Sequence, residues 1–121
     1  MVLSVKINLE EGKPEDIKML CSKYVSERKS KQPTGPSAGS FFRNPASAPA
    51  GKLIQDSGLK GVKVGGAVIS EVHANFIVNS GGASSGDILR LMEKVQDKVL
   101  EDSGEILLPE VRILGKLGFD Q

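Results

Sequence analysis

Aromatic residues are scarce in this chain. It contains no tryptophan, one tyrosine and four phenylalanines among 121 residues, so it is poor in the rings that usually stack on nucleic-acid bases or flavins. Sixteen basic and fifteen acidic residues leave a net charge of +1. The chain therefore lacks the basic surface that a polyanion would need, and we expect no nucleic-acid partner.

Cysteine and histidine are each present once. Cys21 alone excludes an internal disulfide and suits a reducing compartment. His73 has neither a cysteine nor a second histidine near it that would complete a metal site, so we expect no bound metal. No signal peptide is visible and no apolar run reaches membrane-spanning length, which predicts a cytoplasmic protein with no membrane contact.

The length fits one domain, which we place over residues 1–121. Apolar and polar residues alternate over residues 3–9, and this alternation predicts a half-buried strand. After Pro14, apolar residues recur at helical spacing as far as Tyr24, which predicts a helix with one face packed on the core. Cys21 lies on that face and is expected to be a small buried hydrophobe.

The remaining segments alternate between strand and helix patterns. We expect a short helix over residues 50–56, strands over 62–64, 73–79 and 106–114, and a long amphipathic helix from a capping box at Ser84 and Asp87 to about residue 103. Gly65 and Gly66 indicate a bulge or a close backbone approach. This order predicts an α+β domain with a small mixed sheet, two main helices on one face and a short extra helix.

Residues 33–45 form the most unusual stretch of the chain. Three prolines in it are typical of a loop, yet Phe41 and Phe42 adjoin one another in its middle. Two adjacent aromatics anchor a loop against apolar residues and so hold the polar groups beside them, Ser40 among these. Composition alone favours a packed surface loop, but loops fixed on a scaffold are also where binding sites occur.

One acidic and one basic residue lie close together near the end of the chain. Period-two spacing places Glu110 and Arg112 on the same face of the last predicted strand. They are either a surface ion pair of little energetic value or a positioned pair at a site.

Four motifs stand out in chain order. They are Pro-Ser-Ala-Gly-Ser-Phe-Phe-Arg-Asn-Pro at 36–45, Ala-Gly-Lys-Leu-Ile through Gly-Leu-Lys-Gly at 50–61, Ser-Glu-Val-His-Ala-Asn-Phe-Ile-Val-Asn at 70–79 and Pro-Glu-Val-Arg-Ile-Leu-Gly at 109–115. Together they resemble one enzyme family, the UDP-N-acetylenolpyruvoylglucosamine reductases, over their C-terminal domain. The resemblance implies an enzyme of peptidoglycan precursor synthesis in which FAD is reduced by NADPH and passes hydride to C3 of the enolpyruvyl group of UDP-N-acetylglucosamine enolpyruvate. A proton then adds at C2.

The same resemblance implies roles for particular residues. Ser40 matches the family's proton donor, and Glu110 matches the glutamate across the reacting group. Other matching positions concern substrate binding. Lys31 and Asn44 correspond to contacts with the substrate's diphosphate, while Arg43 and Arg112 receive supporting roles in substrate binding.

The family's FAD-binding part lies N-terminal to the region matched here. The resemblance therefore implies a substrate-binding domain without its FAD-binding domain, which we expect to bind no FAD and to be inactive in isolation. The alternative is a stand-alone module that reuses the fold to bind a nucleotide sugar or a protein. A structural domain with no ligand is less favoured, because four residues match motif positions at the predicted site: Ser40, Asn44, Glu110 and Arg112.

Overall fold

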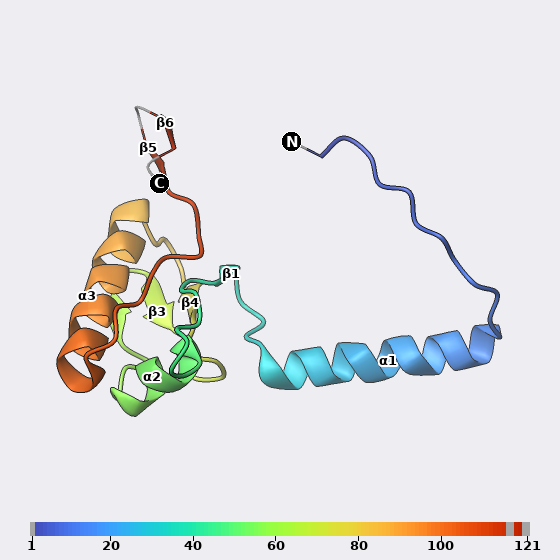
Figure 1. Cartoon of the computed structure of the whole chain (residues 1–121), viewed down its shortest axis with the longest axis horizontal. Coiled ribbons are helices and arrows are strands. Elements are labelled where there is room, and N and C mark those ends of the chain that lie inside the picture. Colours follow the sequence, from blue (N-terminus) through green and yellow to red (C-terminus); the bar gives the residue numbers. More distant parts are fainter. Residues whose placement is uncertain (1, 116–117, 120–121) are drawn as a thin grey trace.

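A four-stranded antiparallel sheet covered by helices forms the centre of the fold (Figure 1). The computed structural model describes residues 2–115 and 118–119. In chain order the elements are α1 (Pro14–Lys31), β1 (Ser37–Ser40), α2 (Ala50–Asp56), β2 (Lys63–Val64), β3 (Ala67–Ile69), β4 (Phe76–Asn79), α3 (Ser85–Ser103), β5 (Leu114–Gly115) and β6 (Gly118–Phe119).

The sheet has the strand order β1-β4-β3-β2, and each neighbouring pair is antiparallel. The predicted α+β class is confirmed, whereas the sheet is antiparallel and not mixed. Only a few residues connect β2 to β3 and β3 to β4, and a parallel pair would need a crossover of a dozen residues or more. The short links between these strands therefore exclude parallel neighbours.

The β2–β3 connection explains the pair of glycines at 65 and 66. Gly65 has a φ of 54° and turns the hairpin, so the predicted bulge is not found there. A Cβ on Gly66 would clash with the carbonyl oxygen of Gly81. The close backbone approach that the sequence indicated is therefore real, and it packs the hairpin against the turn before α3.

The core lies between the sheet, α2 and α3. The helix α3 buries one stripe, consisting of Leu91, Met92, Val95 and Val99. The predicted capping box begins this helix: the Asp87 backbone N–H donates to the Ser84 hydroxyl, and the Asp87 carboxylate accepts from the Ser84 backbone N–H. A left-handed Gly104 ends it.

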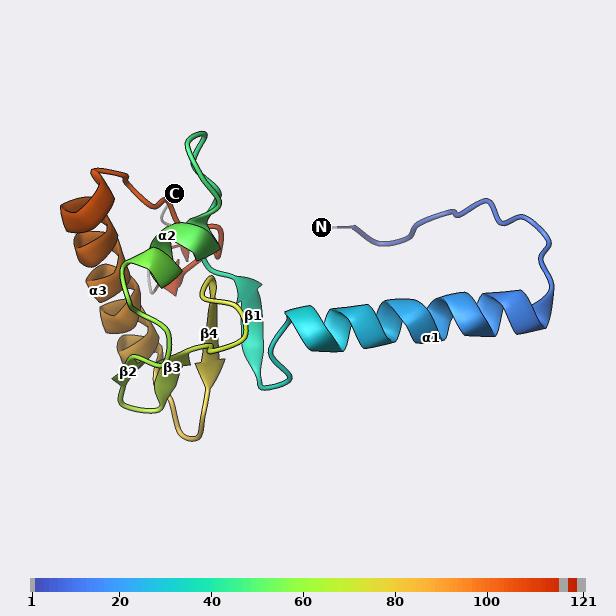
Figure 2. The same ribbon diagram turned by 90° about the horizontal axis from the view of Figure 1, so that it is seen from below.

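The helix α1 forms over the predicted residues but does not pack as predicted. Figures 1 and 2 show it projecting away from the sheet and the other helices. Its apolar face is exposed, with Leu20 47% and Tyr24 58% accessible, and Cys21 is exposed rather than buried. An amphipathic pattern specifies which face is apolar, but it does not supply the surface that covers that face.

Two predicted strands do not form as predicted in the described part of the chain, and of the second, over 106–114, only Leu114 lies in a strand, β5. Residues 3–9 are extended but exposed and unpaired within the described chain, because a strand forms only where another backbone offers hydrogen bonds. Over 106–113 the chain makes a single bridge, from Pro109 to Phe42. Proline has no N–H to donate to a ladder, which interrupts the strand that the apolar pattern indicated.

Candidate functional site

Ser40 and Asn44 line one pocket of about 340 Å³ beside the β1–β4 edge of the sheet. The loop after β1 forms one wall, the first turns of α2 form a second, and the turn before β4 forms a third. The lining is mostly polar and comprises Ser40, Asn44, Pro49, Gly51, Lys52, Gln55, Val72, His73, Ala74 and Asn75.

Ser40 is exposed at the end of β1, opposite Phe76 in the sheet register. Gly39, just before it, has a φ of 87°, which only glycine adopts readily. The next two side chains, Phe41 and Phe42, are 3% and 2% accessible. The predicted aromatic anchor is therefore present, and within the described residues the Ser40 hydroxyl has no hydrogen-bond partner of its own.

The Asn44 carboxamide uses its oxygen in a hydrogen bond within the chain and leaves its NH₂ group available to a ligand. Its Oδ1 accepts a hydrogen bond from the backbone N–H of Ala50 at 2.9 Å, at the start of α2. This bond fixes which end of the amide faces the helix. The Nδ2 group, with two N–H donors, is then the end available to a ligand oxygen.

His73 also lines the pocket, although the sequence did not predict it as a site residue. Its Nδ1 accepts from the backbone N–H of Asn75 at 3.2 Å, and its ring meets Phe76 edge-on at 4.9 Å between centroids. A nitrogen that accepts a hydrogen bond carries no proton there, so Nε2 is the ring's donor. The only signal in the sequence was the position of His73 inside a family motif.

Lys52 and Gln55 were also missed, since neither stands out by spacing or composition. They occur on successive turns of α2 and line the same pocket. Lys52 also pairs with Asp56 four residues later. Only the packing of α2 beside the loop shows that Lys52 and Gln55 face Ser40's pocket.

Backbone hydrogen bonds bring Glu110 close to the loop that carries Ser40. Its N–H donates to the carbonyl of Phe41 at 2.8 Å, and the N–H of Arg43 donates to Leu108 at 2.9 Å. The Glu110 side chain is 58% exposed and lies 4.0 Å from Arg43 Nε. The carboxylate thus pairs with Arg43, and Arg112 is exposed nearby in sequence.

Lys31 is not brought to this pocket. It is the last residue of α1, is exposed, and is absent from the pocket lining. The structure therefore groups Ser40 with Asn44 and brings Glu110 to the backbone beside them, but it leaves Lys31 on the projecting helix.

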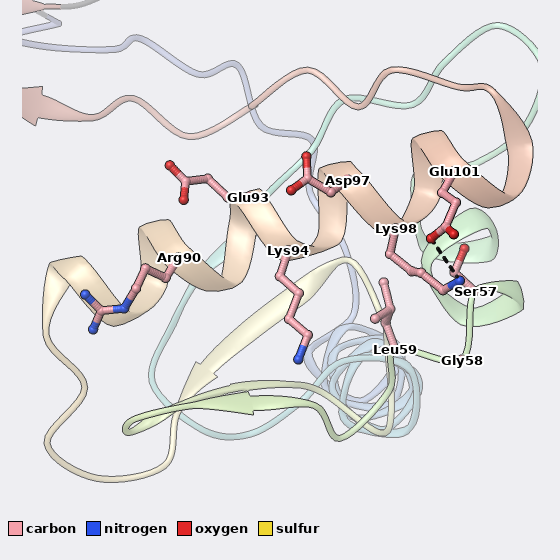
Figure 3. Close-up of a pocket in the computed structure, with 9 residues that line it drawn as sticks. All are labelled: Ser57, Gly58, Leu59, Arg90, Glu93, Lys94, Asp97, Lys98 and Glu101. Carbon is pink, nitrogen blue, oxygen red and sulfur yellow. Dashed lines mark hydrogen bonds and ion pairs between the residues drawn. The ribbon is translucent and has the colours of Figure 1, made fainter.

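A second, larger hollow of about 730 Å³ lies over α3 and the residues that follow α2 (Figure 3). Lys98 extends toward Ser57 and pairs with Glu101, while Glu93 and Asp97 point to the opposite side of the helix from Lys94 (Figure 3). Hydrogen bonds to Asp102 and Glu101 raise the pKa of Lys98. This open hollow of mixed charge holds none of the residues predicted for the site.

Among the described residues, no group of three or more potential metal ligands is found. None of the described helices is long and apolar enough to cross a membrane.

An antiparallel sheet with helices on it, and a polar pocket at its edge, place the chain in the α+β class. Comparison with known proteins identifies its family. Residues 29–114 match the family model described as UDP-N-acetylenolpyruvoylglucosamine reductase, C-terminal domain. The chain belongs to this family.

Individual relatives carry the same name. The reductase of Caldanaerobacter subterraneus subsp. tengcongensis is 47% identical over 117 residues, covering 96% of this chain and 39% of the relative. That of Parasynechococcus marenigrum is 50% identical, with 95% and 39% covered. The crystal structure of the reductase from Thermus caldophilus superposes with a TM-score of 0.68 at 41% identity, covering 85% of this chain and 36% of that one. The chain thus spans about 39% of the length of these curated relatives.

Proposed function

We propose that this chain is the substrate-binding and proton-donating part of a cytoplasmic UDP-N-acetylenolpyruvoylglucosamine reductase of peptidoglycan precursor synthesis. The observation that supports this best is Ser40. Its hydroxyl is exposed in a polar pocket, and the two residues after it are buried. An exposed hydroxyl on a fixed backbone is what a positioned acid requires.

In this proposal Ser40 delivers the proton of an overall reduction. A hydride adds to C3 of the enolpyruvyl double bond and leaves an electron pair at C2. The Ser40 O–H bond breaks as a C2–H bond forms, and solvent returns a proton to the serine oxygen. In the same proposal Glu110 faces the reacting group from the opposite side. A hydrogen bond from its backbone N–H to the Phe41 carbonyl keeps it beside the loop that carries Ser40.

The substrate's diphosphate is assigned to the donors of the pocket. The Nδ2 group of Asn44 is free to donate, because Ala50 occupies its Oδ1. Lys52 and His73 line the same pocket and add an ammonium and a ring N–H. Arg43 and Arg112 keep their supporting roles. Lys31, the last residue of α1, remains a proposed contact of the diphosphate in the substrate-bound reductase.

The pocket does not fit a flavin. Its lining contains no phenylalanine, tyrosine or tryptophan on which a flavin could stack, and its volume of about 340 Å³ is near the lower end of ordinary ligand pockets. FAD and NADPH, which supply the hydride, are therefore assigned to the part of the reductase outside this chain, and the chain alone is proposed to be inactive and free of FAD.

The face of α1 is proposed to contact that flavin-binding part. The C-terminal domain model begins at residue 29, whereas similarity to whole reductases extends over 96% of the chain. Most of α1 is therefore similar to whole reductases, although it lies outside the residues that match the C-terminal domain model. Its exposed apolar face, together with the exposed alternating residues 3–9, is the surface such a neighbour would bury.

The test is Ser40→Ala in a full-length reductase that contains this chain. Stopped-flow absorbance should show flavin reduction by NADPH nearly intact. Reoxidation by substrate should slow by at least the roughly 10²–10⁴-fold typical of a lost general acid, and Ser40→Cys should recover part of the rate. Ser47→Ala is the matched control, since Ser47 is an exposed serine of the loop after β1 and lies outside the pocket lining. Unchanged reoxidation in Ser40→Ala would remove the serine from the mechanism.

A second candidate is a stand-alone module that binds a nucleotide sugar, because the pocket is formed by this chain's residues alone. A flavin-binding domain encoded directly before this region favours the reductase. A separate ribosome-binding site and a preceding stop codon favour the module.

A further inference from the structure

Asn75 is a buried polar residue of the pocket lining. It is 4% accessible. Its Oδ1 accepts from the backbone N–H of Phe42 at 3.0 Å, and its Nδ2 donates to the carbonyl of the same residue at 2.8 Å. Its own carbonyl accepts from the N–H of Phe41 at 3.0 Å. One residue thus makes three hydrogen bonds to the two residues that follow Ser40.

These bonds extend the sheet beyond its last ladder pair. The β1–β4 pairing ends at Ser40 and Phe76 after a register shift. A carboxamide has the donor and acceptor of a peptide group, so the Asn75 side chain takes the place of a neighbouring strand for Phe42. The loop therefore continues in a fixed direction past Ser40, held by Asn75 on one side and by the bridge from Phe42 to Pro109 on the other.

The phenylalanine anchor by itself does not give that direction. Burial of Phe41 and Phe42 is strong, but the hydrophobic effect is non-directional and lets a loop slide or rotate over its contacts. Hydrogen bonds to both polar groups of Phe42 fix its peptide planes. Because Ser40 is two residues away along the same backbone, they also fix where its hydroxyl lies.

Asn75 also joins two walls of the pocket. Its backbone N–H donates to Nδ1 of His73, while its side chain holds the loop that carries Ser40. A shift of this residue would move the proposed proton donor and His73 relative to one another.

We propose that Asn75 is the positioning residue for Ser40, which sets the distance from the serine hydroxyl to the bound enolpyruvyl group by clamping the backbone of Phe41 and Phe42. The inference rests on the proposed function of Ser40. Asn75 itself transfers no proton.

A double-mutant cycle in the full-length reductase tests the proposal. Asn75→Ala should slow reoxidation by substrate roughly 10²-fold, the order expected when a reacting group is misplaced by about 1 Å, with flavin reduction by NADPH unchanged. On the Ser40→Ala background the same substitution should slow reoxidation no further, because there is no hydroxyl left to misplace. Equal slowing in both backgrounds would overturn the proposal.

The matched control is Asn79→Ala. Asn79 ends β4, the strand that Asn75 precedes, and holds the next turn through Oδ1, which accepts from the backbone N–H groups of Gly81 and Ala83, but it lies outside the pocket lining. Reoxidation should stay near wild type in this variant. A rate loss equal to that of Asn75→Ala would show a general effect of losing a turn, and would overturn the positioning role.

A second variant and a second measurement guard against misfolding. Asn75→Asp keeps an acceptor for the Phe42 N–H and replaces the Nδ2 donor with a carboxylate oxygen that the Phe42 carbonyl repels, so it breaks one of the two side-chain hydrogen bonds and is the second variant if Asn75→Ala does not fold. Hydrogen exchange at the Phe41 and Phe42 amides should be slow in wild type and accelerate in either variant. Unchanged exchange and an unchanged reoxidation rate in a folded Asn75 variant would overturn the positioning role alone. Wild-type reoxidation in Ser40→Ala would instead overturn the proposed function, and with it the role of Asn75 in catalysis.

Discussion

The backbone N–H of Glu110 donates to the carbonyl oxygen of Phe41 at 2.8 Å. This bond joins the segment after α3 to the loop after β1, two parts of the chain that are far apart in sequence. It places a carboxylate next to the backbone that carries Ser40, yet the side chain is 58% exposed and 4.0 Å from Arg43. An exposed pair at that distance stabilises the fold little. The carboxylate is therefore free for a role in binding or chemistry.

Glu110→Gln should accordingly lower the turnover of the full-length reductase by roughly 10²-fold or more while changing the free energy of unfolding by less than about 0.5 kcal/mol. Steady-state kinetics and urea unfolding measure the two effects. Glu93→Gln, an exposed glutamate on α3, is the control and should change neither. A large stability loss in Glu110→Gln would mean that the side chain is structural.

Gly51→Ala should disturb the pocket from the side of α2. A Cβ at this position would lie 2.9 Å from Cε1 of His73, so the ring must move. We expect weaker binding of UDP-N-acetylglucosamine derivatives and a shifted His73 ring resonance, both measurable by NMR titration. Gly86→Ala, another glycine in the first turn of a helix, has ordinary contacts of 3.5 Å or more and should leave binding unchanged. Identical affinities in both variants would place the ligand elsewhere.

The capping box of α3 makes a prediction about acid stability. Hydrogen bonds from the backbone N–H and hydroxyl of Ser84, with Arg90 contributing less, hold the pKa of Asp87 below its ordinary value of 3.8. A lowered pKa in the folded state means stabilisation that is complete above the ordinary value and is lost as pH falls below it. Asp87→Asn should therefore remove that acid-dependent part of the stability.

Ser84→Ala should lower the free energy of unfolding by about 1 kcal/mol at neutral pH. It should flatten the acid dependence only in part, since the backbone N–H of residue 84 still donates to Asp87. Urea unfolding from neutral pH down through the ordinary carboxyl range measures both variants. Asp97→Asn, an exposed carboxylate in the middle of α3, serves as the control. A slope below pH 3.8 that Asp87→Asn leaves intact would contradict the assignment.

Leu20→Glu tests the proposed contact of α1. Leu20 is 47% accessible in this chain, so the substitution should change the unfolding of the chain alone by less than about 0.5 kcal/mol. In the full-length reductase, where the face is proposed to be buried, it should lower the melting temperature. Ser26→Glu, on the opposite face of the helix, should be harmless in both. Equal melting temperatures for the two full-length variants would count against a buried α1.

The sequence by itself determined the local features of this protein. Helix bounds follow from signals a few residues long, such as Pro14 at the start of α1 and the Ser84–Asp87 box at the start of α3, because these groups satisfy backbone donors of their own first turn. The α+β class follows from the order of these local patterns, and each family motif is a continuous stretch of sequence. The catalytic roles of Ser40 and Glu110, and the single-domain assignment, remain predictions.

Only the tertiary structure decided what each apolar face and each polar side chain meets. Residues 3–9 and α1 have the pattern of buried elements but are exposed, since periodicity specifies a face and says nothing of a partner. Likewise, no spacing in the sequence shows that Asn75 clamps Phe42, or that His73 and Lys52 share a pocket with Ser40. Hydrogen bonds and pocket walls between distant segments depend on the three-dimensional course of the backbone, which sequence separation does not encode.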